Sequence, residues 1–171
     1  MDSSEEMVPA WSADGRFVYY ASRRSGRLEL WKSPAGGGDS VQVTSNGGFV
    51  AAESRDGRTL YFTKGGSDVG LWSMNVGGGD EKKIINAPVG RNWAVGEKGI
   101  YYVLSPSVDG EPYLLFFYDA ATGSASRPVP LHGSVRTLPI SVVTVSPDER
   151  WIVWAQRDLL DYDVMLVENF R

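Results

Sequence analysis

Few side chains in this sequence of 171 residues could perform nucleophilic or metal chemistry. His132 is the one histidine and there is no cysteine, so a zinc site built from histidine and cysteine ligands is excluded. A catalytic triad would also depend on His132, but the Gly-x-Ser-x-Gly sequence that presents a nucleophilic serine does not occur. We interpret His132 as a loop residue and predict no catalytic residues, no metal site and no cofactor.

The densest acidic cluster is the segment Asp158–Asp163, which holds three aspartates. Three carboxylates on one loop could bind Ca2+, which takes several oxygen ligands. The spacing is not that of an EF-hand loop, and no glycine provides its sharp turn. We favour a solvated loop between two strands, and cation binding is the alternative.

Glu53 is a carboxylate at a repeat position that is otherwise apolar. The equivalent residues of the other copies are Trp11, Trp93 and Val145. Glu53 could face a channel and bind a ligand, or it could form an ion pair with an arginine such as Arg55 or Arg91. We favour the ion pair and interpret the two tryptophans as packing residues. The binding residues stay unassigned.

These side chains must be positioned by a repeat with a period of about 42 residues. The repeated elements are Asp14-Gly15-Arg16 with Asp56-Gly57-Arg58, Leu30-Trp31 with Leu71-Trp72, and the triple glycines at 36–38 and 77–79. Asp-Gly between hydrophobic runs is typical of a tight hairpin, and the alternating segment Leu28–Trp31 is typical of a half-buried strand. Strands rather than a helix follow the triple glycines, so we predict hairpin turns there and not phosphate loops.

Two looser copies of the repeat begin near Gly99 and Ser146. A period near 42 residues with four strands per copy predicts an all-β fold made of β-propeller blades. A β-solenoid or sandwich is the alternative, but neither needs four strands per period. Trp31 and Trp72 occupy one repeat position, and we interpret them as part of the core between blades.

Three segments of the chain, Ser12–Arg16, Ser54–Arg58 and Ser146–Arg150, resemble the Ser-Pro-Asp-Gly-Arg signature of TolB-type (WD-like) propeller repeats. The Leu-Trp strand and the glycine turn match that repeat as well, and the resemblance extends over residues 9–167. The third copy departs from it, with Val95–Lys98 in place of the signature. The resemblance implies about four antiparallel four-stranded blades.

The repeat divides the chain into a predicted tail over residues 1–8 and blades over 9–48, 49–90, 91–136 and 137–171. The resemblance implies that propellers of the TolB type form closed rings of six or seven blades. We therefore expect the four blades of this chain to be part of a larger ring or of a ring completed by a dimer. The last blade lacks an outer strand after Val164–Val167. Because unpaired strand edges and bare apolar faces favour association, we expect a homodimer through open blade faces.

The net charge of −4 at pH 7 disfavours nucleic-acid binding, which needs a basic face. The first blade is locally basic through Arg16, Arg23, Arg24, Arg27 and Lys32, which we interpret as solvent-facing charge. No apolar run approaches the roughly 18 residues of a membrane span. The acidic start argues against a signal peptide. Without cysteines the compartment stays open between cytoplasm and periplasm.

The resemblance implies a non-enzymatic module that acts in protein binding, as a scaffold or as a sensor, with a protein or peptide partner. The end of the chain, Asp163–Arg171, also resembles sensor propellers that follow bacterial winged-helix regulators. The alternative is the gating propeller of a prolyl-oligopeptidase-like hydrolase whose catalytic domain is absent. A propeller lyase or lactonase would need a metal or a histidine-rich channel, which one histidine does not supply.

Overall fold

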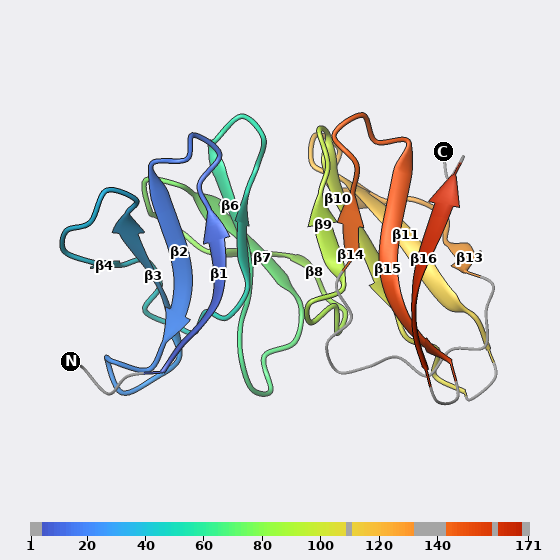
Figure 1. Cartoon of the computed structure of the whole chain (residues 1–171), viewed down its shortest axis with the longest axis horizontal. Helices are drawn as coiled ribbons and strands as arrows, with labels where there is room; N and C mark the ends of the chain where they lie inside the picture. Colours follow the sequence, from blue (N-terminus) through green and yellow to red (C-terminus); the bar gives the residue numbers. More distant parts are fainter. Residues whose placement is uncertain (1–4, 109–110, 132–142, 159–160, 169–171) are drawn as a thin grey trace. The chain divides into compact units, whose positions relative to one another are not determined.

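The computed structural model describes residues 5–108, 111–131, 143–158 and 161–168, with residues 155–158 and 161–168 described by their backbone alone. These residues form sixteen β-strands and no helix, which confirms the predicted all-β fold (Figure 1). The described part of the chain accordingly contains no helix of the length and apolarity that a membrane crossing requires. The chain divides into two compact units, residues 1–90 and 91–171.

The first unit contains two antiparallel four-stranded sheets. The first sheet has the order β1 (Glu6–Trp11), β2 (Phe17–Ser22), β3 (Glu29–Pro34) and β4 (Val41–Gln42). The second sheet has the order β5 (Ala51–Glu53), β6 (Thr59–Thr63), β7 (Leu71–Asn75) and β8 (Lys82–Ile85). Each strand pairs with the next one along the chain, which is the arrangement of a propeller blade.

The second unit contains a third and a fourth sheet. The third sheet consists of β9 (Trp93–Val95), β10 (Gly99–Leu104) and β11 (Tyr113–Asp119), with β12 (Ser124–Ala125) and β13 (Val129–Leu131) both paired to β11. The fourth sheet has the order β14 (Val143–Val145), β15 (Trp151–Asp158) and β16 (Asp161–Glu168). His132 lies outside the described residues.

β1 begins at Glu6, so the predicted tail over residues 1–8 extends too far. Glu6 pairs with Ser22, and Met7 pairs with Ala21, both on β2. The tail was predicted from the low β-propensity of these residues, and pairing with a neighbouring strand overrides such a weak local preference.

The acidic segment Asp158–Asp163 belongs largely to a hairpin and not to a loop. Asp158 ends β15, Asp161 begins β16, and the two residues are paired across the strands. The loop predicted between two strands is therefore shorter than the whole segment, because the antiparallel ladder includes Asp158 and residues 161–163. Residues 159–160 lie outside the described residues, and of this segment's side chains, on which cation binding depends, the structure describes none.

One apolar core lies between the first and second sheets. Tyr19 and Leu30 of the first sheet pack with Leu60 and Phe62 of the second, and each of the four is 1% exposed or less. Full burial of such a side chain contributes about 1.5–3 kcal/mol relative to exposure. Trp72 packs against this core, as predicted.

Trp31 does not belong to this core, although it occupies the repeat position of Trp72. Adjacent residues of a strand point to opposite faces, so Trp31 points away from the face on which Leu30 is buried. The guanidinium of Arg24 lies 4.9 Å from the centre of the Trp31 ring and covers it. The prediction of an inter-blade core residue is thus wrong for Trp31, because the other face of the first sheet meets no sheet of this unit.

The repeated Ser-x-Asp motif builds the turn between the first two strands of a sheet. The Ser12 hydroxyl donates to Asp14 Oδ1 at 2.8 Å and accepts the backbone N–H of Phe17 at 2.9 Å. Asp14 Oδ1 also accepts the backbone N–H of Arg16 at 2.9 Å, and this bond together with the serine hydroxyl lowers the pKa of Asp14 to about 2. The same bonds recur at Ser54 and Ser146. The motif therefore has a structural role.

Candidate functional site

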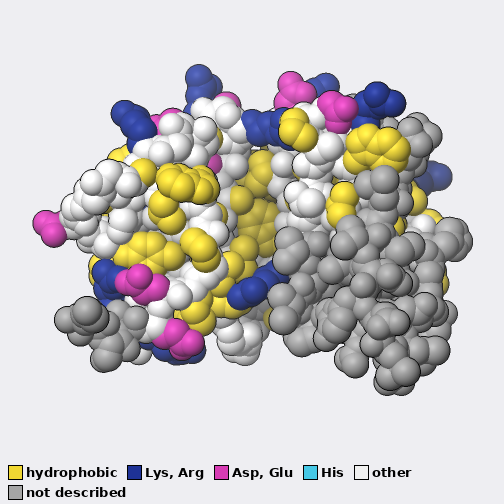
Figure 2. All heavy atoms as spheres, viewed as in Figure 1, with side chains coloured by type: hydrophobic (Ala, Val, Ile, Leu, Met, Phe, Trp, Pro, Cys, Tyr) yellow, Lys and Arg dark blue, Asp and Glu magenta, His cyan; other side chains and the backbone are white. Residues whose placement is uncertain are grey.

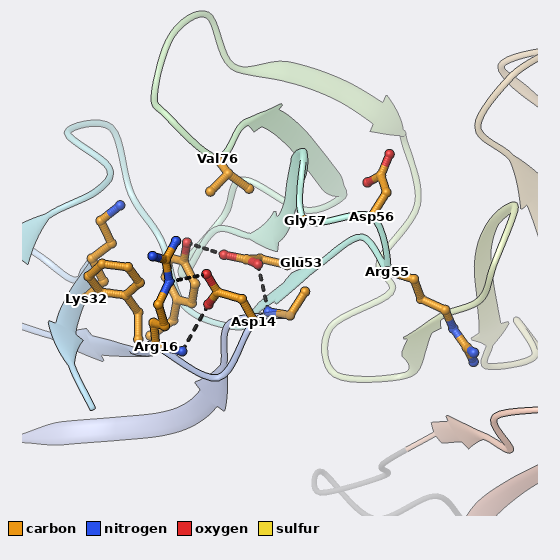
Figure 3. Close-up of a pocket in the computed structure, with 11 residues that line it drawn as sticks. Asp14, Arg16, Lys32, Glu53, Arg55, Asp56, Gly57 and Val76 are labelled. Atoms are coloured by element: carbon orange, nitrogen blue, oxygen red, sulfur yellow. Dashed lines mark hydrogen bonds and ion pairs between the residues drawn. The ribbon is translucent and has the colours of Figure 1, made fainter. Parts of the chain in front are cut away.

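A pocket of about 360 Å3 opens between the first and second sheets, beside the turn that joins β1 to β2 (Figure 3). Its polar lining comprises Asp14, Arg16, Lys32, Glu53, Arg55 and Asp56, and its apolar lining includes Phe17, Tyr19 and Val76. The pocket therefore brings the one unusual carboxylate of the repeat, Glu53, together with part of the basic first blade.

Glu53 connects the two sheets through both of its carboxylate oxygens. Oε1 accepts the Tyr19 hydroxyl at 2.6 Å, and Oε2 accepts the backbone N–H of Ala13 at 2.8 Å. Tyr19 is 1% exposed, and its burial together with this hydrogen bond raises the pKa of its hydroxyl above the ordinary value. We call this arrangement, a glutamate that accepts both a tyrosine hydroxyl and a turn amide of the preceding sheet, a carboxylate bridge.

The ion pair predicted for Glu53 is wrong. Arg55 points away from Glu53 (Figure 3), and in the described residues Glu53 takes part in no ion pair. The reason is the strand register: Glu53 pairs with Leu60 and shares its face, which meets the first sheet. Arg55 lies beyond the end of β5, in the turn.

Lys32 is the cation of this pocket that no acid balances. Its ammonium nitrogen lies 5.1 Å from the centre of the Phe17 ring, and within the described residues it forms no ion pair or hydrogen bond. Arg16, by contrast, contacts Asp14 Oδ2 at 2.6 Å. The pocket can thus offer an ammonium group, above an apolar floor, to an acceptor group of a ligand.

A second carboxylate bridge lies in the other unit, between the third and fourth sheets. Glu149 Oε2 accepts the Tyr101 hydroxyl at 3.2 Å, and Oε1 accepts the backbone N–H of Glu97. Tyr101 and Tyr19 are equivalent in the repeat, and so are the turn residues Glu97 and Ala13. The two bridges therefore join the same groups of one sheet to the next.

The two glutamates come from different repeat positions. Glu53 ends the first strand of its sheet, whereas Glu149 occupies the turn position held by Gly15 and Gly57 elsewhere. Glu149 keeps the left-handed backbone of that position, with φ of 54° against 70° and 67° for the two glycines. This conformation disfavours a residue with a side chain. Neither bridge was predicted from the sequence, although the glutamate in place of the turn glycine was a visible signal.

The residue equivalent to Glu53 in the first sheet is Trp11, and it is 64% exposed. Trp11 was predicted to pack, and that prediction is wrong, because the sheet face on which it lies has no partner sheet in its unit. Trp93 is 6% exposed, so its interpretation as a packing residue is confirmed. The strand register shows, however, that Val95 and not Trp93 is the residue of the third sheet equivalent to Glu53.

The pocket beside Glu53, like the rest of the described residues, lacks a cluster of metal-binding side chains. No group of three or more histidine, cysteine, aspartate or glutamate side chains is placed there to hold a metal ion. The carboxylates of the pocket are occupied in holding backbone amides and hydroxyls. The arrangement is suited to binding.

The chain is similar in sequence to the Tol-Pal system protein TolB of two strains of Anaeromyxobacter dehalogenans. The identity is 33% over 91 residues, which is 48% of this chain and 19% of the relative. The match thus spans about a fifth of the length of these relatives. No family model matches the chain.

Solved propellers are similar to nearly the whole chain. TolB of Acinetobacter baumannii superposes with a TM-score of 0.72 at 19% identity, covering 96% of this chain and 41% of its own. A putative TolB of Agrobacterium tumefaciens superposes with a TM-score of 0.74 at 17% identity, and the match covers 98% of this chain and 59% of the putative TolB. A prolyl endopeptidase structure is also similar, with a TM-score of 0.61 at 15% identity, and the match covers 98% of this chain and 28% of the endopeptidase. The chain therefore has the fold of TolB-like β-propeller blades.

Proposed function

We propose that the chain is a non-enzymatic protein-binding module, and that a segment of its partner docks in the pocket beside Glu53. The observation that carries the proposal is Lys32, whose ammonium group has no carboxylate partner in the described residues although it lines a pocket. A backbone carbonyl or a carboxylate of a polypeptide is the complementary group. The similarity to TolB supports a binding role, and a scaffold or sensor role is the finer form of the same proposal.

A photo-crosslinking residue at Val76, which lines the pocket, tests this proposal in the cells that produce the protein. We expect a discrete adduct with another polypeptide, and we expect Lys32→Glu to lower its yield at least fivefold, because it reverses the charge that faces the ligand. Lys98→Glu, at an exposed lysine of another turn, serves as the matched control.

An adduct that is absent, or that is equally abundant with Lys32→Glu and Lys98→Glu, would contradict the proposed site. The identity of the adduct separates the finer roles. A hydrolase domain as the captured polypeptide would favour the alternative, in which these blades gate access to an enzyme. A DNA-binding regulator would favour a sensor role.

We also propose that a second copy of the chain covers the face of the first sheet that carries Trp11. The equivalent residue Glu53 contacts a preceding sheet, and Trp11 is 64% exposed. Light scattering should therefore give about twice the chain mass of 18.7 kDa, and Trp11→Arg should restore the monomer. A mass of one chain at every concentration would refute the dimer.

A further inference from the structure

A second pocket, of about 350 Å3, lies at the other end of β2, where the first sheet again borders the second. It is lined by the turn between β2 and β3, by the connection between β4 and β5, and by the turn between β6 and β7. The side chains and backbone that matter for its chemistry are those of Arg23, Arg27, Gly47, Lys64, Gly66 and Ser67.

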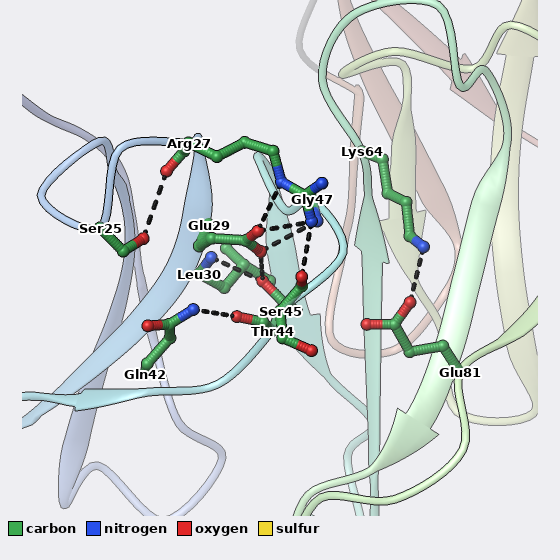
Figure 4. A network of polar contacts seen from close by, with 10 residues as sticks. All are labelled: Ser25, Arg27, Glu29, Leu30, Gln42, Thr44, Ser45, Gly47, Lys64 and Glu81. Carbon is green, nitrogen blue, oxygen red and sulfur yellow. Dashed lines mark hydrogen bonds and ion pairs between the residues drawn. The ribbon is translucent and has the colours of Figure 1, made fainter.

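Three ion pairs neutralise most of the charge around this second pocket. Arg27 Nε donates to the buried Glu29 at 2.9 Å, and its guanidinium also donates to the carbonyl of Ser45 at 2.5 Å (Figure 4). Lys64 points to Glu81, with its ammonium nitrogen 2.6 Å from the carboxylate. The lining residue Asp68 accepts a bond from Lys83 at 3.0 Å.

Arg23 carries the one charge of the second pocket that these three ion pairs do not neutralise. Its guanidinium is exposed and has no ion pair or hydrogen bond within the described residues. Arg27 has also used only part of its capacity, since a guanidinium carries five N–H donors and two of its nitrogens are engaged. The second pocket therefore has a net positive charge and unused donors that lie on the same turn.

The opposite wall offers backbone donors without side chains in the way. Gly66 has φ of +78°, and an added Cβ there would meet no atom within 4 Å. Nowhere in the described chain do the backbone amides of Gly65, Gly66 and Ser67 donate a hydrogen bond. Successive free amides in a turn that contains a left-handed residue are a common way to bind an anion.

We propose that the second pocket binds an oxyanion, a phosphate or a carboxylate, with Arg23 as its principal charged contact and the turn of Gly65–Ser67 as the opposite wall. Planar guanidinium groups bind such anions through paired hydrogen bonds, and glycines allow close approach of the backbone. The ligand is either a free small anion or an acidic side chain of a polypeptide. This site differs from the pocket beside Glu53 and does not depend on the function proposed for it.

Titration of the whole chain with inorganic phosphate, followed by amide NMR at constant ionic strength, tests the proposal. We expect saturable shifts of Gly47, Gly65, Gly66 and Ser67 with a Kd on the order of 1 mM. Arg23→Gln should weaken binding at least fivefold. Arg127→Gln, at an exposed arginine of the other unit, should leave it unchanged.

An acidic peptide such as acetyl-Asp-Glu-Asp-amide forms the second arm. Shifts of the same amides by the peptide, displaced by phosphate, would identify an acidic side chain as the natural ligand, whereas shifts by phosphate alone would identify a free anion. Equal shifts by sodium chloride, or phosphate binding that survives Arg23→Gln, would overturn the proposal.

Discussion

Replacing Glu149 by glycine is expected to lower the free energy of unfolding of the second unit by about 2 kcal/mol, although it restores the residue that this turn position normally holds. Glycine removes the cost of the left-handed backbone, which is roughly 1 kcal/mol. It also removes a carboxylate that is 6% exposed and that accepts the Tyr101 hydroxyl and the Glu97 amide. Loss of the bridge outweighs the relief of strain, because the hydroxyl of the buried Tyr101 and the Glu97 amide both lose this charged acceptor.

Glu149→Ala separates the two contributions. Alanine loses the bridge and keeps the unfavourable backbone, so it should be less stable than Glu149→Gly by about 1 kcal/mol. Urea unfolding followed by amide NMR signals of each unit is the measurement, since two units need not unfold in one step.

A control at the exposed Glu111, changed to glutamine, should stay within about 0.5 kcal/mol of the natural chain. Combining Glu149→Gln with Tyr101→Phe should give a coupling energy of about 0.5–3 kcal/mol. Additive effects of the two substitutions, or a Glu149→Gly variant as stable as the natural chain, would show that the bridge contributes nothing.

The two departures from the repeat signature in the second unit depend on each other. In the third sheet the turn is shortened, and Gly96 stands where the first two sheets have Ser12 and Ser54. A Cβ on Gly96 would lie 2.8 Å from Glu149 Oε1, so the glycine leaves room for the carboxylate of the fourth sheet. Each departure weakens the local signature, and together they build one contact.

The features that could be predicted from the sequence are those encoded by residues close together in the chain. The turns close through bonds between Ser12, Asp14 and residues no more than five positions away, so a short motif is enough to identify them. The alternation of apolar residues similarly predicted the strands and the all-β fold. The predictions of the turns and strands were confirmed because these features do not depend on how one sheet packs against the next.

The site residues could not be predicted in the same way, because their partners are remote in sequence. Glu53 lies 40 residues from Ala13 and 34 from Tyr19. Its carboxylate was assigned to an arginine such as Arg55 or Arg91, because opposite charge was the available guide. The predictions for Trp11 and Trp31 were wrong for a related reason. A repeat position predicts the same environment in every copy, but the face of the first sheet that carries these tryptophans meets no sheet of its unit.

The second large effect is expected at Glu29, a carboxylate that is 2% exposed although nothing in its local sequence marks it as buried. Its oxygens accept the Thr44 hydroxyl at 2.7 Å, the Gly47 amide at 2.9 Å and Arg27 Nε at 2.9 Å (Figure 4). They thereby fix the connection that follows β4. Charged side chains are exposed on the face drawn in Figure 2, whereas Glu29, like Lys64 and Glu149, is buried.

Glu29→Ala should lower the free energy of unfolding of the first unit by about 3 kcal/mol, since three donors lose a charged acceptor. Asp39→Ala, at an exposed aspartate in the connection between β3 and β4, is the control and should have little effect. A loss below about 1 kcal/mol for Glu29→Ala would mean that water replaces the carboxylate without cost.

Glu29→Gln distinguishes stability from binding. Glutamine keeps an oxygen that can accept the hydrogen bond from Thr44 or Gly47, so the fold should lose less than with alanine. The charge of Arg27, which lines the second pocket, is then no longer balanced. Phosphate affinity should rise about threefold in this variant while stability falls, because an added positive charge near the anion is worth about 1 kcal/mol or less at a solvated surface. If the pocket bound phosphate only because the surrounding fold is intact, phosphate affinity would fall together with stability in this variant. The oxyanion site instead requires phosphate affinity to rise while stability falls.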